Sequence, residues 1–200
     1  SLFCLFFLAL IIRLSLLYLD YSWDVNNHMV WARDIWTRGT PGLYETISSN
    51  VFASLYPNYP PLAIFLFAFV YPLQGILHSI AWGINLTVPF FPSKLIFFME
   101  TQTFLAGLFK LPAIIADLGL AGLIYAYARR LRSGQAKKIP LIAASLVLFN
   151  PVFIFNSALW GQIDVLPVFF VLLALYSLQY HKNYFLPAFW FLVSLLIKPT

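Results

Sequence analysis

Two acidic residues in polar stretches beside strongly apolar runs are the first candidates for chemistry. Asp24 lies near the start of the long polar stretch 21–62, and Asp164 closes the polar turn 159–164. A carboxylate at the boundary of a membrane bundle is costly to keep, so its presence suggests a functional site. Asp24 has an alternative role as a helix N-cap, because Asp is preferred there and a helix can begin at Val25.

Two lysines and a third acid could complement these carboxylates. Lys110 and Asp117 are about two helical turns apart in the apolar run 105–128, and they therefore share one helix face. They can pair with each other or with nearby backbone inside a bundle, as intramembrane charges usually do, or they can bind a ligand. Lys198 follows the last apolar run, where a lysine can also extend from a helix end toward water.

The composition indicates an integral membrane protein. The 200 residues are 62% hydrophobic and 19% aromatic, and only 10% are charged, against about 25% in an average soluble domain. The net charge of +5 does not indicate nucleic-acid binding, because basic residues flank apolar runs, most clearly in the loop 129–139. Such enrichment is typical of cytoplasmic loops, and it predicts that Asp24 and Asp164 lie on the opposite side of the membrane.

Cysteine and histidine usage gives no metal or disulfide pattern. The single cysteine, Cys4, lies in an apolar run, and the three histidines are scattered without metal-ligand spacing. We therefore predict no dedicated metal site and no certain cofactor. A divalent cation would be compatible with the sequence if Asp24 and Asp164 converge.

The pattern of apolar runs predicts an all-α fold, a polytopic transmembrane helix bundle that forms a single domain over 1–200. Prolines are expected to break the run 105–128 at residues 110–112 and to interrupt another run at residues 150–151. The proline-containing region 81–104 fits either a span or a re-entrant or interfacial segment. The predicted spanning helices are 1–19, with Arg13 facing the interior or extending to the surface, 62–80, 105–128, 140–158, 165–180 and 184–197.

The long first external loop, 20–61, is expected to carry a helix at residues 25–38. Val25, Met29, Ala32 and Trp36 fall on one stripe there, which predicts an amphipathic helix in the membrane interface. Polar residues of this helix, including His28 and Asp34, are expected at its surface or in supporting roles. The chain starts with Ser inside an apolar run and stops right after another apolar run, so we expect it to be a fragment of a longer protein.

Several motifs in a fixed order resemble those of the GT-C membrane glycosyltransferases, especially the bacterial and archaeal group similar to GPI mannosyltransferases. The resemblance covers nearly the whole chain and implies that the chain is the N-terminal part of a larger GT-C-like bundle with further spans. In chain order the motifs are Trp23-Asp24-Val25-Asn26 leading to Tyr59-Pro60-Pro61-Leu62, then Lys110-Leu111-Pro112 with Asp117, Asn150-Pro151, Trp160-Gly161-Gln162-Ile163-Asp164, and Lys198-Pro199.

The resemblance implies transfer of a hexose, often mannose, from a polyprenyl-phosphate-linked donor to a lipid or glycan acceptor. The reaction would take place on the outer side of a prokaryotic cell membrane, or the lumenal side of the endoplasmic reticulum. Asp24 matches the loop acid that serves as catalytic base, since an acceptor hydroxyl must lose its proton. The phosphate leaving group needs cationic or hydrogen-bonding neighbours. Donor or substrate binding is expected for Arg33, Tyr59, Lys110, Asp117, Gln162, Asp164 and Lys198.

Two other classes of function compete with the enzyme. Prolines within spans and the intramembrane Lys110 and Asp117 also suit a transporter. A transporter would predict an internal repeat, which the sequence does not show, and it leaves the loop 20–61 unexplained. A non-catalytic membrane scaffold is the third alternative, and the acid-bearing loop argues against it only weakly.

Overall fold

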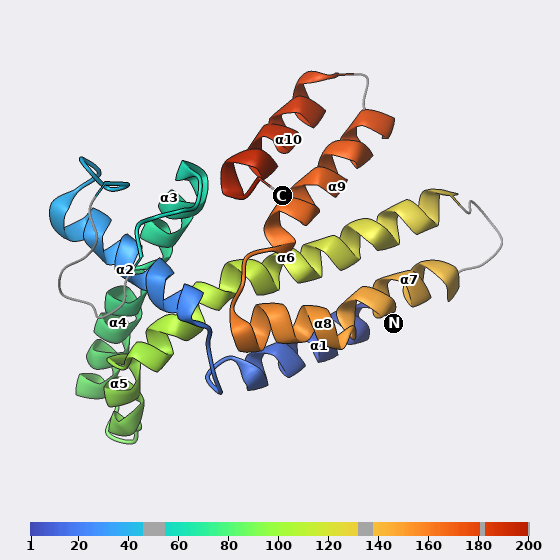
Figure 1. Cartoon of the computed structure of the whole chain (residues 1–200). Helices are drawn as coiled ribbons and strands as arrows, with labels where there is room; N and C mark the ends of the chain where they lie inside the picture. The colour runs from blue at the N-terminus through green and yellow to red at the C-terminus, as the bar shows by residue number, and fades with distance from the viewer. Residues whose placement is uncertain (46–54, 132–137, 181–182, 200) are drawn as a thin grey trace.

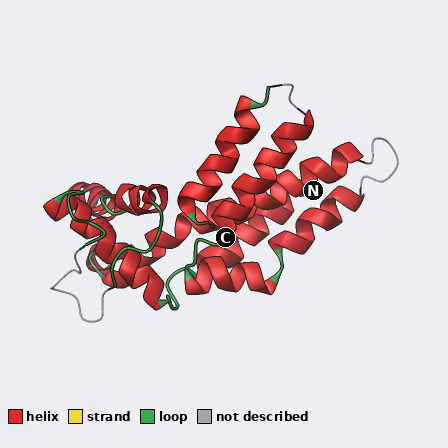
Figure 2. Ribbon diagram, turned by 45° about the horizontal axis from the view of Figure 1, so that its top comes forward, coloured by secondary structure: helices red, strands yellow, loops and turns green. Residues whose placement is uncertain are grey.

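The computed structural model describes residues 1–45, 55–131, 138–180 and 183–199 (Figure 1). The regular structure of these residues is helical, and they contain no strand (Figure 2). The all-α prediction is therefore confirmed for the described part of the chain.

The longest helix, α6 (Gln102–Leu131), is the axis against which most other helices pack. It is apolar on nearly all sides, which is the pattern of a helix surrounded by other helices or by lipid. Figure 1 shows it running from the end of the molecule that holds α2–α5 to the opposite end. The helices that contact it include α1 (Leu2–Leu16), α7 (Lys138–Leu148), the π-helical turn η1 (Phe155–Trp160) and α9 (Val165–Tyr180).

Among the described residues, two stretches of helix are long and apolar enough to cross a membrane. They are α6 and the 27 residues of Pro61–Thr87, and α7 with Pro151–Trp160 makes a third if that pair, bent by 42°, is one span. The bend confirms the predicted interruption at residues 150–151, where Asn150 caps the short helix α8 (Pro151–Ile154). The predicted spans at 1–19, 165–180 and 184–197 are present as the shorter apolar helices α1, α9 and α10 (Phe185–Ile197).

The predicted break of the 105–128 run is wrong, because α6 continues through Pro112 without interruption. Proline removes one backbone donor from a helix, but neighbouring helices in a bundle can compensate for the freed carbonyl. Position 112 is therefore tolerated inside a helix that packs on several others.

The ambiguous region 81–104 does not form a span of its own. Its first residues complete α4 (Leu73–Thr87), which follows α3 (Pro61–Val70) after a short break. The prolines then separate α4 from the seven-residue helix α5 (Ser93–Met99), and α6 begins soon after. Figure 1 shows α3, α4 and α5 grouped with α2 at the end of the molecule where α6 begins.

The helix predicted in the first loop is α2 (Trp23–Arg38), and its N-cap is Ser22 rather than Asp24. The Ser22 hydroxyl accepts a hydrogen bond from the Val25 backbone N–H at 3.4 Å. The helix therefore begins before Val25, and Asp24 lies in its first turn with its carboxylate available for other partners. An acid in a first turn interacts favourably with the positive end of the helix dipole.

Of the two roles expected for the polar residues of α2, at its surface or in support, burial excludes the surface position for four of them. Asn26, Asn27, His28 and Asp34 are all buried, whereas the stripe residue Trp36 is 60% exposed. One cause is a contact distant in sequence: the Asn27 side chain accepts from the backbone N–H of Leu55 at 3.0 Å, and the Trp31 indole donates to the Leu55 carbonyl at 2.8 Å. Leu55 thus lies against the part of α2 that carries Asn27 and Trp31, while Gln102 of α6 donates to Asn26.

Candidate functional site

Four separate segments bring polar side chains together beside the first turn of α2. Asp24 comes from α2, Tyr59 from the loop before α3, Gln162 and Asp164 from the turn between η1 and α9, and Lys198 from just beyond α10. Each residue lies at or near the end of a helix. We call these five residues the Asp24 cluster.

Gln162 connects Asp24 to the rest of the cluster. Its side-chain amide donates to Oδ2 of Asp24 in a short hydrogen bond, and its Oε1 accepts from the Tyr59 hydroxyl at 3.5 Å. Asp24 and Gln162 are both half-buried, so the carboxylate is oriented by a neutral donor while part of it stays accessible. A carboxylate held in this way can accept a proton from a bound hydroxyl group.

Backbone contacts fix the turn that carries Gln162 against the start of α2. The Ser22 N–H donates to the Trp160 carbonyl at 2.9 Å, and the N–H groups of Gly161 and Gln162 both donate to the Asn156 carbonyl at 2.9 Å. Gly161 has φ +81°, a conformation that residues with a Cβ rarely adopt. This positive φ explains why glycine stands directly before Gln162.

Lys198 is the positive charge of the cluster. It forms an ion pair with Asp164, its Nζ donates to the Tyr59 hydroxyl at 3.5 Å, and Nζ lies 5.3 Å from the centre of the Tyr59 ring. Burial is the largest single influence on its pKa and would lower it, but the hydrogen bonds and charge interactions with Asp164 and Tyr59 together outweigh burial. The pKa is therefore raised and the ammonium stays charged. About a third of this side chain remains exposed, which leaves room for an anionic ligand.

His28 lies beneath the cluster and was expected at the surface or in a supporting role. It is 1% exposed, its ring stacks on Phe67 at 4.0 Å, and it meets the Tyr59 ring edge-on at 5.2 Å. Burial and the nearby charge of Lys198 lower its pKa to about 3. Its Nε2 has no hydrogen-bond partner among the described residues. His28 therefore acts as a neutral aromatic support for Tyr59, and no spacing in the sequence links positions 28 and 59.

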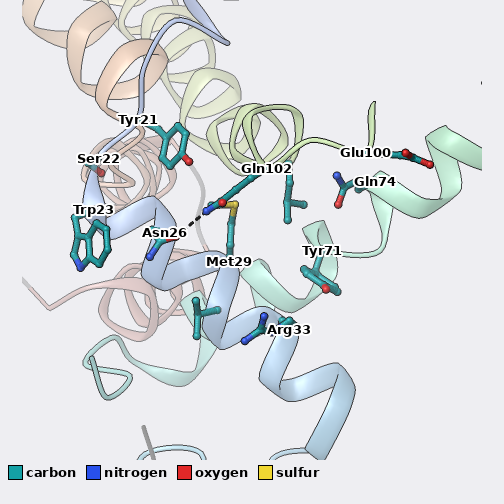
Figure 3. A pocket seen from close by; sticks show the side chains of 12 residues that line it. Tyr21, Ser22, Trp23, Asn26, Met29, Arg33, Tyr71, Gln74, Glu100 and Gln102 are labelled. Atoms are coloured by element: carbon teal, nitrogen blue, oxygen red, sulfur yellow. Dashed lines mark hydrogen bonds between the residues drawn. The ribbon is translucent and has the colours of Figure 1, made fainter. Parts of the chain in front are cut away.

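A second polar feature, a cleft of about 640 Å³, adjoins the start of α2 (Figure 3). Residues of α2, α4 and α6 line it, and the Gln102 amide donates to Asn26 Oδ1 across it at 2.9 Å. Asp24 itself does not line this cleft, but its neighbours Ser22 and Trp23 do. Arg33, predicted to bind substrate, lines the cleft and is not part of the Asp24 cluster. The other lining residues include Tyr21, Tyr71, Gln74 and Glu100.

Lys110 and Asp117 lie inside the bundle and do not contact each other. Lys110 is fully buried, and its Nζ donates to the carbonyls of Leu17, Asp20 and Ala158. Asp117 is also fully buried and binds the Arg13 guanidinium at 3.0 Å and the Ser157 hydroxyl at 2.6 Å. Their hydrogen-bonding capacity is thus used largely for packing helices together, and neither contacts the Asp24 cluster.

The two predicted acids of the external side do not form a shared carboxylate pair. Asp24 is bound by the Gln162 amide, whereas Asp164 is bound by Lys198. Within the described residues, no three His, Cys, Asp or Glu side chains come close enough to hold a metal ion together.

Comparison of the chain with known protein families, with curated protein sequences and with solved structures found no match. The residues and geometry of the Asp24 cluster and the adjoining cleft are therefore the features from which a function can be inferred.

Proposed function

We propose that the chain is part of a membrane glycosyltransferase that moves a hexose, such as mannose, from a polyprenyl-phosphate donor to an acceptor hydroxyl. The observation that supports this most is the convergence of four separate motifs in the Asp24 cluster. The cluster combines an oriented carboxylate with a retained positive charge, and transfer from a sugar phosphate requires both.

The proposed reaction is a single displacement. The hydroxyl oxygen of the acceptor attacks the anomeric carbon of the hexose, and Asp24 accepts the proton that this hydroxyl loses. The bond between that carbon and the phosphate oxygen breaks, and the polyprenyl phosphate leaves with the bonding electrons. Lys198 stabilises the negative charge of the leaving phosphate. The Tyr59 hydroxyl turns from its 3.5 Å contact with Gln162 and donates its hydrogen bond to the phosphate, since burial raises the pKa of Tyr59 and keeps its proton in place.

The cleft beside α2 suits the acceptor. Amide side chains, tyrosines, the cation Arg33 and the anion Glu100 line it, and such groups can donate to and accept from the hydroxyls of a sugar. The aromatic and apolar side chains of α3 and α10 that remain exposed, such as Phe65, Phe69 and Leu192, offer a surface for the polyprenyl chain. These assignments make Gln162 and Asp164 positioning residues for Asp24 and Lys198.

The first prediction concerns the proposed base. In membranes that contain the protein, we expect Asp24→Asn to lower the rate of hexose transfer from polyprenyl-phosphate mannose or glucose by about a hundredfold or more, since an amide cannot accept the proton. The assay follows radiolabelled hexose into the acceptor pool at matched expression.

Asp20→Asn is the matched control for Asp24→Asn. Asp20 is an exposed acid just before α2 whose carboxylate accepts from the Tyr21 backbone N–H at 2.8 Å, so its loss of charge should leave transfer within about twofold. Equal activity of Asp24→Asn and the unmodified protein would remove Asp24 from catalysis. If no polyprenyl-linked hexose is a substrate, the proposed reaction fails and uptake by proteoliposomes tests the transporter alternative.

A further inference from the structure

A basic and aromatic cleft lies between the C-terminal ends of α6 and α9. Figure 1 shows these helix ends on the side of the molecule away from α2. The cleft holds about 640 Å³ and is lined by Tyr125, Ala126, Arg129, Arg130, Tyr176 and Tyr180. It shares no residue with the Asp24 cluster.

Aromatic rings hold Arg130 in the cleft. Its guanidinium carbon lies 4.3 Å from the centre of the Tyr180 ring and 5.0 Å from that of Tyr176. The two rings are themselves in contact, with centres 4.8 Å apart, and Tyr127 packs against Tyr176 at 5.0 Å. A guanidinium stacked on rings keeps its N–H groups at its edge, where they can bind two oxygens of one phosphate.

The positive charge of this cleft has no acidic counterpart nearby. The sequence contains no Asp or Glu between Asp117 and Asp164, and none after Asp164. Asp117 is committed to Arg13 inside the bundle, and Asp164 belongs to the Asp24 cluster. Within the described residues, no ion pair engages Arg129 or Arg130.

The position of the cleft indicates the source of the anion. α6 is long and apolar enough to cross a membrane, and Arg129 and Arg130 lie in its last turn. The end of a spanning helix lies at the level of the lipid headgroups, and basic pockets between such helices bind anionic headgroups. We propose that this cleft binds the phosphate of an anionic phospholipid, with both arginines and the tyrosine hydroxyls as donors. The proposal is independent of glycosyl transfer.

The test uses the purified chain in a zwitterionic detergent and short-chain phosphatidylglycerol as the probe. Binding is followed by native mass spectrometry and by the rise in thermal unfolding temperature. We expect phosphatidylglycerol to bind more tightly than phosphatidylcholine, whose choline group is repelled by the arginines. We expect Arg130→Gln and Arg129→Gln each to weaken phosphatidylglycerol binding by about tenfold, which corresponds to about 1.4 kcal/mol.

Lys94→Gln is the matched control, because it removes one exposed positive charge in α5. If the arginine variants lose phosphatidylglycerol binding and Lys94→Gln keeps it, the result supports the site. An equal loss in Lys94→Gln would show attraction to net charge only, and would overturn it. Inorganic phosphate is the second arm: if it binds as tightly as the phospholipid, the ligand is a soluble anion and the lipid assignment is wrong. Equal affinity for phosphatidylcholine would also contradict the proposal.

Discussion

His28 is a titratable residue that stays neutral in the folded protein and acts as an aromatic packing residue. Its imidazole lies between Phe67 and Tyr59 and is almost fully buried. A protonated ring there would lie near the Lys198 ammonium without solvent, so the neutral form is retained to a pH of about 3. At neutral pH the ring is therefore a flat, uncharged surface that holds Tyr59 in position to donate toward the phosphate in the proposed reaction.

The lowered pKa of His28 has a consequence for stability, and His28→Phe tests it. Below its ordinary value of 6.5, the unfolded chain binds a proton that the folded chain does not, so stability falls as the pH falls toward 3. The loss amounts to about 2 kcal/mol at pH 5. We expect His28→Phe, which keeps the stacked ring, to remove that part of the loss. Unfolding in detergent at pH 7.5 and pH 5 measures it, and identical pH dependence in both proteins would contradict the assignment.

Substitution of Lys110 can distinguish a structural role of this residue from a substrate-binding role. Because its ammonium donates to three buried carbonyls, Lys110→Met should lower the free energy of unfolding by about 3 kcal/mol or more. Lys198→Met, at a half-exposed ion pair, should change it by about 1 kcal/mol or less. Unfolding of both variants in the same detergent measures the difference. Unchanged stability of Lys110→Met with a raised KM would instead favour the predicted donor-binding role.

At the scale of elements, the helix ends determine the site. Asp24, Tyr59, Gln162 and Lys198 stand at the start of α2, before α3, before α9 and after α10. In the sequence these residues stand near the ends of apolar runs, and this position made them candidates for a site. The surface position expected for polar residues of α2 fails at Asn27, because Leu55 binds Asn27 and Trp31 through hydrogen bonds. No local periodicity reports such a long-range contact.

The sequence also cannot show which side chains pair. Lys110 and Asp117 share a helix face by spacing, yet each binds groups from other helices. Gln102 and Gln74, which line the cleft beside α2, carry no motif and are missed. The signal that could have identified them is an amide side chain at the start of an otherwise apolar run. The direction in which these side chains point depends on how α4 and α6 pack.

Gly161 offers a test of how closely the Gln162 turn and α2 must approach. A Cβ at this position would lie 2.4 Å from a Val25 methyl carbon and 3.1 Å from the Lys110 side chain. We expect Gly161→Ala to displace the turn, weaken the Gln162–Asp24 hydrogen bond and reduce hexose transfer by about tenfold, equivalent to about 1.4 kcal/mol. Transfer activity and unfolding temperature are measured together.

Gly42→Ala is the matched control for that change. Gly42 also has a positive φ, +66°, but a Cβ there would meet nothing within 4 Å. Gly42→Ala therefore introduces backbone strain of about 1 kcal/mol, but its Cβ collides with no neighbouring atom. Equal losses of transfer in both variants would show that strain alone matters and that the turn does not position Asp24.

At the scale of the whole molecule, one buried charge network joins distant helices. Arg13 of α1 binds Asp117 of α6 and the Leu148 carbonyl at the end of α7, while Asp117 also binds Ser157 of η1. The network contacts no residue of the Asp24 cluster. Its arrangement instead fixes how α1, α6 and the bent α7–η1 pair lie relative to one another.

Removal of one charge from this network should lower the free energy of unfolding more than removal of both charges. We expect Arg13→Leu to lower the free energy of unfolding by about 3–5 kcal/mol, because it leaves the Asp117 carboxylate buried without a counter-ion. Arg13→Leu combined with Asp117→Leu should recover a substantial part of that loss. A double-mutant cycle by denaturant unfolding measures the coupling, and simple additivity would show that the two residues act independently.

The order of the site residues along the chain sets when the site can form during synthesis. Gln162 follows Asp24 by 138 positions, and a ribosome adding about 5–20 residues per second needs about 7–30 s to cover that interval. Lys198 emerges later still. Throughout this time Asp24 is present in the nascent chain without its amide or its neighbouring ammonium. The Asp24 cluster is therefore complete only after α9 and α10 have been synthesised, and a chain that stops before α9 contains Asp24 without Lys198.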